Sequence, residues 1–138
     1  MKNAAHRVLP CLLGTTNYLM VNQRCIYFDK STSTVAVART RCKSSFNGKG
    51  KMYEPGNYQE SLNIAQEGNS KFGKGIWWMG VKREGGKFVF DSDGSPVPFT
   101  PTKVTHNNGD CVLVFVAYWQ MYKCSDSSQM GTLCEYGG

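Results

Sequence analysis

The stretch "NNGDCVLVFVAYWQMYKC", residues 107–124, encloses an apolar run between two cysteines. Residues 111–119 are mostly β-branched, aromatic or aliphatic, a composition that is typical of a core strand. The run ends at Trp119, and the chain continues with Gln120 and Met121. The strand between the cysteines indicates the fold, and the pair after Trp119 bears on the kind of ligand site that the protein can hold.

Length and charge describe one domain with a mildly basic surface. A chain of 138 residues supports a single domain with one substantial core. Its 16 Lys and Arg against 10 Asp and Glu give a formal charge of +6, dispersed along the chain. This dispersal predicts solubility and a weak attraction to anionic partners, and it disfavours a nucleic-acid-binding protein. No apolar run approaches the roughly 18 residues of a membrane span, so we expect no membrane insertion within this chain.

The N-terminal residues differ from the rest of the chain. Residues 1–14 begin with a basic residue, but their apolar stretch is short and is broken by Pro10. A signal peptide needs a longer apolar segment, so we interpret these residues as a mature or trimmed end. Residues 1–10 are accordingly expected to be an N-terminal extension, and residues 11–138 the domain.

Six cysteines, at positions 11, 25, 42, 111, 124 and 134, are spread over the whole chain. They form no C-x-x-C motif, and the only histidines are His6 and His106, so the spacing of zinc ligands is absent. An even number favours three disulfides in an oxidising compartment, which predicts a secreted or extracellular protein. Buried thiols in a cytosolic protein are the alternative. Six cysteines allow 15 pairings, and their spacing alone does not choose among them.

The first half of the chain predicts a strand and two helices. Residues 25–29 read as a strand, and residues 43–56, rich in Gly and Lys, read as a loop. Between them, Ser and Thr side chains can cap a helix whose apolar positions recur at helical spacing. These positions are Val35, Ala38 and Cys42.

The second expected helix is amphipathic. Asn57 is its predicted N-cap, with Glu60 three residues later, and Gly68 is its predicted end. One face carries the apolar positions Tyr58, Leu62 and Ala65, with Ile64 close by.

The second half of the chain is rich in predicted strands. Residues 76–81 and 87–90 form two of them, and residues 111–119 and 131–136 supply the last two. Residues 96–109 form a long loop. Helices first and strands later indicate an α+β domain. Because side chains alternate along a strand, Trp77 and Trp78 are expected to point to opposite faces. Trp78 is predicted to be buried and Trp77 to be exposed or partly covered by a loop.

Motifs of enzymes and cofactor sites are weak in this sequence. The segment "GNSKFGKG", residues 68–75, has Gly75 where a phosphate-binding loop needs Ser or Thr. "DSDG", residues 91–94, lacks the later acidic ligand of an EF-hand and reads as a turn. His106 lies in a polar loop with no nucleophile indicated beside it. We therefore expect neither an enzyme nor a cofactor or metal site.

Six features in chain order carry a family resemblance. They are Trp78-Met79-Gly80-Val81, "KFVFDSDGS" (87–95), "GDCV" (109–112), Trp119, Cys124 and "LCE" (133–135). In this order they resemble the C-type lectin-like domain, with Phe90 where that family commonly has Trp. The resemblance covers about residues 11–136. It implies an α+β fold in which two helices flank antiparallel sheets beside a long irregular loop region.

The resemblance also implies a disulfide pattern. Cys42–Cys134 would tie the first helix to the last strand, and Cys111–Cys124 would lie across the binding face. Cys11–Cys25 would close an N-terminal hairpin, as in the long form of the family.

The calcium–sugar site of the family is not matched here. Members that bind sugar through calcium carry a Glu-Pro-Asn or Gln-Pro-Asp motif and an Asn-Asp pair after the Trp. Here Gln120 and Met121 follow Trp119, and a thioether is a poor calcium ligand. The upstream loop has no carboxylate before Asp110, and it places Lys103 near the expected acidic position. The resemblance therefore implies a calcium-independent protein in which Trp119 packs in the core.

The function that the resemblance implies is that of a secreted, non-enzymatic recognition domain for a protein or for a polar or acidic glycan. A carbohydrate-binding lectin with a non-standard site and a structural protein of an extracellular or mineralised matrix are alternatives. The ligand-binding residues that it predicts are Lys103, Thr105, His106, Asn107, Asn108 and Gln120, with Phe99 and Tyr118 as aromatic contacts. A basic patch is a second candidate, formed by Arg83 and the lysines at positions 49, 51, 71, 74, 82 and 87.

Overall fold

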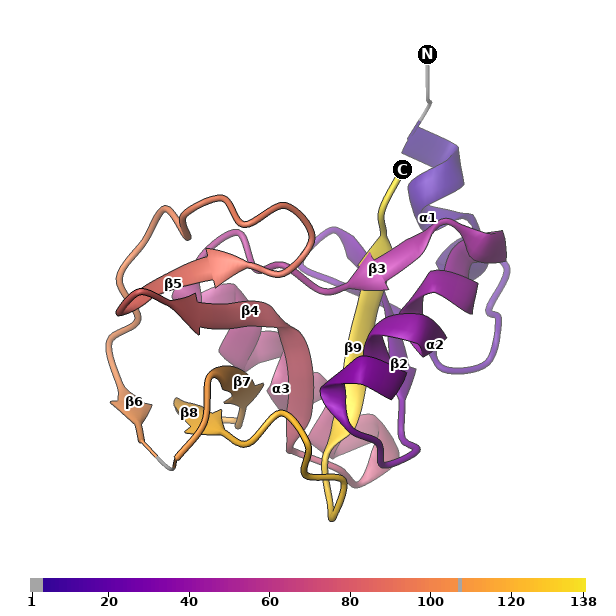
Figure 1. Cartoon of the computed structure of the whole chain (residues 1–138). Coiled ribbons are helices and arrows are strands. Elements are labelled where there is room, and N and C mark those ends of the chain that lie inside the picture. The colour runs from indigo at the N-terminus through magenta and orange to yellow at the C-terminus, as the bar shows by residue number, and fades with distance from the viewer. Residues whose placement is uncertain (1–3, 107) are drawn as a thin grey trace.

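The structure is a computed structural model that describes residues 4–106 and 108–138, and it has an α+β architecture (Figure 1). The described residues form three helices, α1 (Ala4–Leu12), α2 (Val35–Gly48) and α3 (Tyr58–Phe72). The strands are β1 (Tyr18–Val21), β2 (Arg24–Asp29), β3 (Gly50–Met52), β4 (Trp77–Glu84), β5 (Lys87–Phe90), β6 (Val104–Thr105), β7 (Cys111–Val114), β8 (Trp119–Tyr122) and β9 (Gly131–Tyr136). None of the helices in these residues is long and apolar enough to cross a membrane.

The strands form one mixed sheet in the order β1-β2-β9-β4-β7-β8-β6. β3 pairs with β9 and β5 pairs with β4, each off this path. Most pairs are antiparallel, and the parallel ones are β4 with β9 and β6 with β8. The C-terminal strand β9 therefore lies beside strands from the first and second halves of the chain, and it joins both halves into one domain.

The helix predicted around Val35 is α2. Thr34 is its N-cap, with the Thr34 hydroxyl accepting a hydrogen bond from the Val37 amide at 3.3 Å, and its three predicted apolar positions are buried. The expected loop at residues 43–56 is wrong in part, because α2 runs to Gly48 and β3 follows it. Within α2 the backbone of Ser45, Phe46 and Asn47 is not helical. β3 is only three residues long and is held by backbone pairing to β9, so no side-chain period reveals it.

The second predicted helix is α3, and it begins where it was expected. Asn57 caps it, accepting a hydrogen bond from the Glu60 amide at 2.8 Å. The predicted end at Gly68 is wrong, because the helix continues to Phe72 and ends at Gly73, which has a φ of 71°. Position 68 lies inside the helix, and glycine fits there because a Cβ at this position would be 2.6 Å from the Trp77 ring.

Trp77 and Trp78 point to opposite faces of β4, and both are fully buried. Trp77 shares a core with the apolar face of α3, and Trp78 shares a second core with the buried face of α2. The Trp78 indole nitrogen donates a hydrogen bond to the Ser33 carbonyl at 2.8 Å. The expectation that Trp77 is exposed or only partly covered is wrong, because a helix packs on each face of the sheet at this point.

The predicted strand at residues 111–119 is a hairpin rather than one strand. β7 ends at Val114 and β8 begins at Trp119, and these two residues are antiparallel partners. Between them the Phe115 amide donates a hydrogen bond to the Tyr118 carbonyl at 2.8 Å. Residues 115–118 contain no Gly, Pro, Asn or Asp, so the sequence has none of the usual signals of a turn.

Three disulfides join Cys11 to Cys25, Cys42 to Cys134 and Cys111 to Cys124, as the family resemblance implies. The Cys42–Cys134 bond closes the longest loop, with a sequence separation of 92, and in the chain-entropy model such a loop contributes about 4–5 kcal/mol. The Cys111–Cys124 bond joins the two ends of the β7–β8 hairpin.

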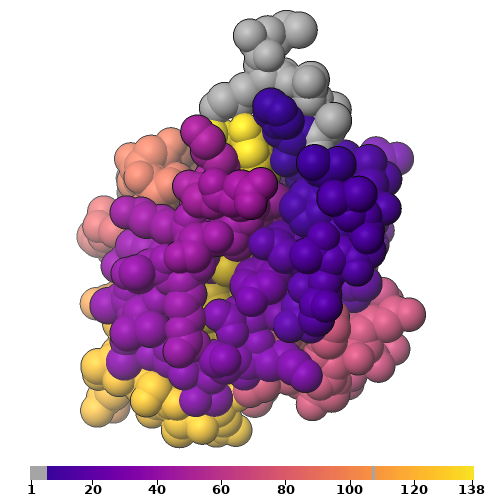
Figure 2. Space-filling view, turned by 90° about the vertical axis from the view of Figure 1, so that its right-hand side faces the viewer, coloured from indigo at the N-terminus to yellow at the C-terminus, as the bar shows by residue number. Residues whose placement is uncertain are grey.

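The first disulfide has a different setting from the one expected. Cys11 lies in α1, so its bond to Cys25 fastens a helix to β2 rather than closing a hairpin of two strands. α1 also runs across the expected boundary between residues 10 and 11. In the space-filling view, the indigo N-terminal segment and the purple α2 make up much of one face, with C-terminal residues in yellow between them (Figure 2).

Candidate ligand-binding surface

The long loop returns to the sheet through β6. Its two residues pair in parallel with β8, so Val104 lies opposite Trp119 and Thr105 lies opposite Gln120. The Lys103 carbonyl accepts hydrogen bonds from the Trp119 amide at 3.1 Å and from the Tyr58 hydroxyl at 2.9 Å. These bonds hold the backbone of the loop against the sheet and α3.

Trp119 of β8 packs in the core beneath the β6–β8 pair. Its side chain is fully buried, and its indole nitrogen donates a hydrogen bond to the Ser61 hydroxyl at 2.8 Å. The rings of Tyr58, Phe88 and Phe99 surround it, with centroid distances of 5.5, 5.8 and 5.8 Å. Trp119 is thus a core residue, as predicted. Phe99, expected as an aromatic contact for a ligand, is half-buried and packs edge-on against this indole.

The other face of the β6–β8 pair carries polar side chains. Because side chains alternate along a strand, Gln120 points away from the core that holds Trp119, and its partner Thr105 lies on the same side. The Lys103 ammonium group lies 5.3 Å from the centre of the Tyr118 ring. The structure therefore brings Lys103, Thr105 and Gln120 together on one face.

The turn of the β7–β8 hairpin adds two stacked aromatic rings to this face. The Phe115 and Tyr118 rings are stacked, with centroids 4.8 Å apart and planes 6° apart. Lys103 lies over the same Tyr118 ring, and the two residues at the tip of the turn, Val116 and Ala117, are exposed. A cation over an aromatic face is favourable by about 0.5–1 kcal/mol at exposed sites, so this positive charge has a preferred position.

A hollow lies next to these stacked rings and is lined in part by Phe115. It has a volume of about 270 Å³, and Gln120 forms part of its wall. The rings of Phe115 and Tyr122 and the side chain of Gln129 also line it. The Thr105 hydroxyl, one strand away, is buried and has no hydrogen-bond partner among the described residues. We name the face formed by Lys103, Thr105, Phe115, Tyr118 and Gln120, together with this hollow, the β6–β8 face.

The remaining predicted binding residues follow β6. His106 and Asn108 are exposed, and Asn108 has a φ of 41°. Asn107 lies outside the described residues. Within the described part of the chain, no group of three or more His, Cys, Asp or Glu side chains could hold a metal ion.

The basic residues of the second candidate are spread over different elements. Lys51 pairs with Glu54 at 2.9 Å, and Lys82 lies 3.4 Å from Glu84. Lys74 donates a hydrogen bond to the Gln129 carbonyl at 3.0 Å. Part of this positive charge is therefore neutralised locally, which makes a concentrated anion-binding patch less favourable than the β6–β8 face.

Two features of the β6–β8 face were not predicted from the sequence. One is the stacking of Phe115 on Tyr118, which depends on a turn without turn residues. The other is the attachment of the loop to Tyr58, a residue that lies 45 positions before Lys103 and was expected to pack on the core. The sequence signal for the first was the pair of aromatic residues that flanks Val116 and Ala117, three positions apart.

Comparisons with known proteins agree on the fold. No protein-family model and no curated protein matches the sequence. Among solved structures, the chain is similar to the carbohydrate-recognition domain of the mouse scavenger receptor C-type lectin, with a TM-score of 0.66, 17% identity, and coverage of 88% of this chain and 94% of that one.

Two calcium-independent proteins are also similar. The C-type lectin SPL-2 from Saxidomus purpuratus has a TM-score of 0.68, 18% identity, and coverage of 88% of this chain and 92% of that one. A calcium-independent type II antifreeze protein has a TM-score of 0.60, 23% identity, and coverage of 86% of this chain and 90% of that one. The order of the strands, the three disulfides and these similarities show that the chain has the C-type lectin-like fold.

Proposed function

We propose that the protein is an extracellular, non-enzymatic recognition domain that binds an acidic glycan on the β6–β8 face without calcium. The observation that carries this proposal is the β6–β8 pairing, which gathers Lys103, Thr105 and Gln120 on one face beside stacked aromatic rings. Three disulfides support the extracellular setting, because such bonds persist in oxidising compartments.

Each part of this face suits one feature of an acidic sugar. The Lys103 ammonium can pair with a carboxylate or a sulfate, and the Gln120 amide can both donate to and accept from hydroxyl groups. The rings that line the hollow offer an apolar wall for the C–H face of a sugar ring. These groups would bind the ligand directly, so a bridging calcium ion is not needed.

The proposal is supported by the chemistry of the position where related lectins hold calcium. Calcium takes six to eight oxygen ligands, and a cation beside it opposes its binding. In this chain the corresponding segment has Lys103 in the loop and Met121 after Gln120, and Met121 is buried in the core. Two of the proteins with similar structures are calcium-independent, which is consistent with this proposal.

A glycan array, read in calcium and again in a chelator beside a pull-down of extracellular proteins, tests the proposal. We expect binding to glycans that carry carboxylate or sulfate groups, unchanged by the chelator. The double variant Lys103→Ala/Gln120→Ala is expected to lose this binding, whereas the matched variant Lys71→Ala/Gln66→Ala, with both exposed residues on α3, is expected to keep it. Capture of a protein without any glycan binding would replace the proposed ligand by a protein.

A further inference from the structure

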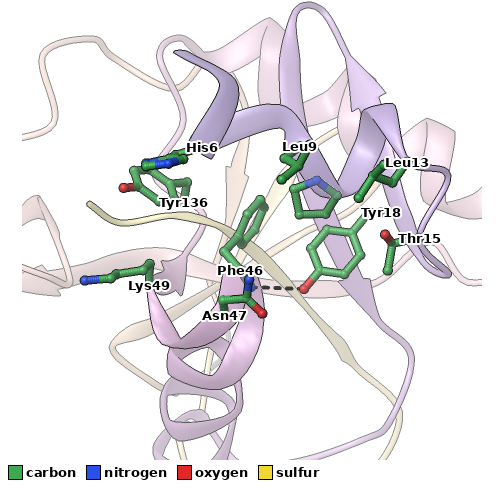
Figure 3. Close-up of a pocket in the computed structure, with 10 residues that line it drawn as sticks. His6, Leu9, Leu13, Thr15, Tyr18, Phe46, Asn47, Lys49 and Tyr136 are labelled. Carbon is green, nitrogen blue, oxygen red and sulfur yellow. Dashed lines mark hydrogen bonds between the residues drawn. The ribbon is translucent and has the colours of Figure 1, made fainter. Parts of the chain in front are cut away.

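Figure 1 shows α1 at the other end of the domain from β6 and β8, and a second hollow lies beside α1. It has a volume of about 400 Å³ and is formed by α1 and the turn after it, β1, the end of α2, and β9 (Figure 3). Its lining residues include Leu9, Pro10, Leu13, Tyr18, Phe46 and Lys49. We call it the α1 pocket.

The lining of the α1 pocket is mostly apolar and aromatic. The Tyr18 and Phe46 rings meet edge to face with centroids 5.0 Å apart, and Tyr136 meets Phe46 at 6.2 Å. Figure 3 shows Leu9 and Leu13, from α1 and the turn after it, above the Phe46 and Tyr18 rings. Ligand pockets have volumes of about 300–1,000 Å³ and walls of this composition, with few polar groups. The α1 pocket therefore has the size and chemistry of a site for a small apolar molecule.

The wall formed by α2 has an unusual backbone. Phe46 and Asn47 have φ values of 54° and 56°, a left-handed conformation that Asn often adopts but that is rare for a bulky residue such as Phe. The Phe46 amide donates a hydrogen bond to the Tyr18 hydroxyl at 3.0 Å, which fixes this conformation and holds the two rings together. Backbone strain of this kind concentrates at functional sites and ligand clamps.

The wall formed by α1 is held in place by a disulfide bond. α1 has nine residues, too few to be a stable helix alone, and the Cys11–Cys25 disulfide fixes it to β2. Leu9 and Leu13 are nevertheless 43% and 71% exposed. The fold thus holds apolar side chains open to solvent beside an aromatic wall, an arrangement that a bound apolar molecule would cover.

The charge around the pocket selects among apolar ligands. No Asp or Glu is among its described lining residues, whereas Lys49 lies at one end. In Figure 3 the Lys49 side chain extends away from the rings, so its ammonium group can meet a charged group outside the apolar part. We propose that the α1 pocket binds a small amphiphile, with an acyl or aromatic body against Leu9, Leu13, Tyr18 and Phe46 and a single anionic group near Lys49.

Decanoate, used below the concentration at which it forms micelles, tests this proposal in the full chain. Titration followed by amide NMR is expected to show saturable shifts confined to the residues around the pocket. Decyltrimethylammonium has an alkyl tail one carbon longer and the opposite charge. It is expected to bind at least about tenfold more weakly, since its charge opposes that of Lys49. Absence of saturable shifts with decanoate overturns the proposal.

Paired variants distinguish specific binding in the α1 pocket from nonspecific adsorption of decanoate elsewhere on the surface. Leu12 and Leu13 are neighbours with exposed fractions of 68% and 71%, but only Leu13 lines the pocket. Leu13→Ser is expected to weaken decanoate binding about fivefold or more, while Leu12→Ser leaves it unchanged. Lys49→Glu is expected to weaken it likewise, and Lys43→Glu, an exposed lysine of α2 outside the pocket, is not. Equal effects within either pair overturn the proposal, as does binding to anionic vesicles without binding to dissolved decanoate.

Discussion

The buried indole nitrogen of Trp119 donates a hydrogen bond to the Ser61 hydroxyl at 2.8 Å, and this bond joins β8 to α3. Both residues are fully buried, and the Ser61 hydroxyl also donates to the Tyr58 carbonyl at 2.6 Å. Ser61 therefore satisfies the polar edge of the largest ring beneath the β6–β8 face. A link between helix and strand at this point fixes the position from which Gln120 extends.

Ser61→Ala tests this link. The substitution leaves the Trp119 N–H buried without a partner, and an unsatisfied buried donor costs about 1–3 kcal/mol. We expect the free energy of unfolding to fall by that amount in urea or guanidinium titrations. Ser70→Ala, an exposed position on the same helix, is the control and is expected to change stability by less than about 0.5 kcal/mol. Equal stability of the two variants would show that the Trp119–Ser61 bond contributes nothing.

Gly68→Ala separates two opposing effects on α3. In an exposed helix interior, alanine is more favourable than glycine by about 1 kcal/mol. Helix propensity alone therefore predicts that Gly68→Ala stabilises the protein. At Gly68, however, the new Cβ would lie 2.6 Å from the Trp77 ring, and overpacking of a core costs about 1–3 kcal/mol. We expect a net loss of stability, measured by denaturant unfolding. A gain in stability would mean that the helix and the Trp77 ring move apart without cost.

The Arg39–Asp91 pair predicts a loss of stability in acid. Arg39 donates two hydrogen bonds to the Asp91 carboxylate, at 2.9 and 2.8 Å, which tie α2 to the turn after β5 and lower the pKa of Asp91. A folded-state pKa below the ordinary 3.8 means that the stabilisation is complete above pH 3.8 and is lost as the pH falls through the folded-state pKa. Because Arg39 is partly exposed, we expect a contribution of only about 1 kcal/mol.

A comparison with Asp91→Asn isolates this contribution. Other groups titrate in the same pH range. Burial raises the pKa of Glu135, so the stability that this group contributes is complete below pH 4.5 and is lost as the pH rises through its folded-state pKa. The difference in unfolding free energy between wild type and Asp91→Asn removes such common terms. It is expected to be largest near pH 6 and to decrease as the pH falls below 3.8 and through the folded-state pKa of Asp91. A difference that does not vary with pH would rule out a role for the charged Asp91.

Calcium is expected to leave the stability of the protein unchanged. A ligand raises the melting temperature only when it binds the folded state, and the described residues contain no acidic cluster that could hold the ion. Thermal unfolding in millimolar calcium and in a chelator, at matched ionic strength, measures this directly. A rise of several degrees in calcium that the chelator reverses would reveal a calcium site in the protein and contradict this prediction.

Sequence patterns correctly predicted α2 and the start of α3, because their signals lie within a few residues along the chain. The helical spacing of Val35, Ala38 and Cys42 identified α2, and the Asn57 cap marked the start of α3 because capping depends on residues three positions apart. The alternation of Trp77 and Trp78 was also correct. Their common burial was not predictable, because it depends on α2 and α3 lying on opposite faces of the sheet.

Other features depend on contacts between distant residues. Gly68 is a usual helix-ending residue, and only the Trp77 ring explains its place inside α3. The turn at residues 115–118 is determined by the pairing of β7 with β8 rather than by turn residues. For the candidate site, the sequence indicated Lys103, Thr105 and Gln120, but their placement on one face required the parallel pairing of β6 with β8. Asn107 remains a prediction from the sequence alone.

The most direct test of the central claim is the affinity of the strongest glycan from the array, measured by calorimetry in calcium and in chelator. We expect equal affinities under both conditions for the wild type. We also expect Lys103→Ala/Gln120→Ala to weaken binding at least about tenfold in both, because two charged or polar contacts of about 1–2 kcal/mol are removed. Binding that disappears in chelator, or that survives unchanged in the double variant, would contradict calcium-independent binding on the β6–β8 face.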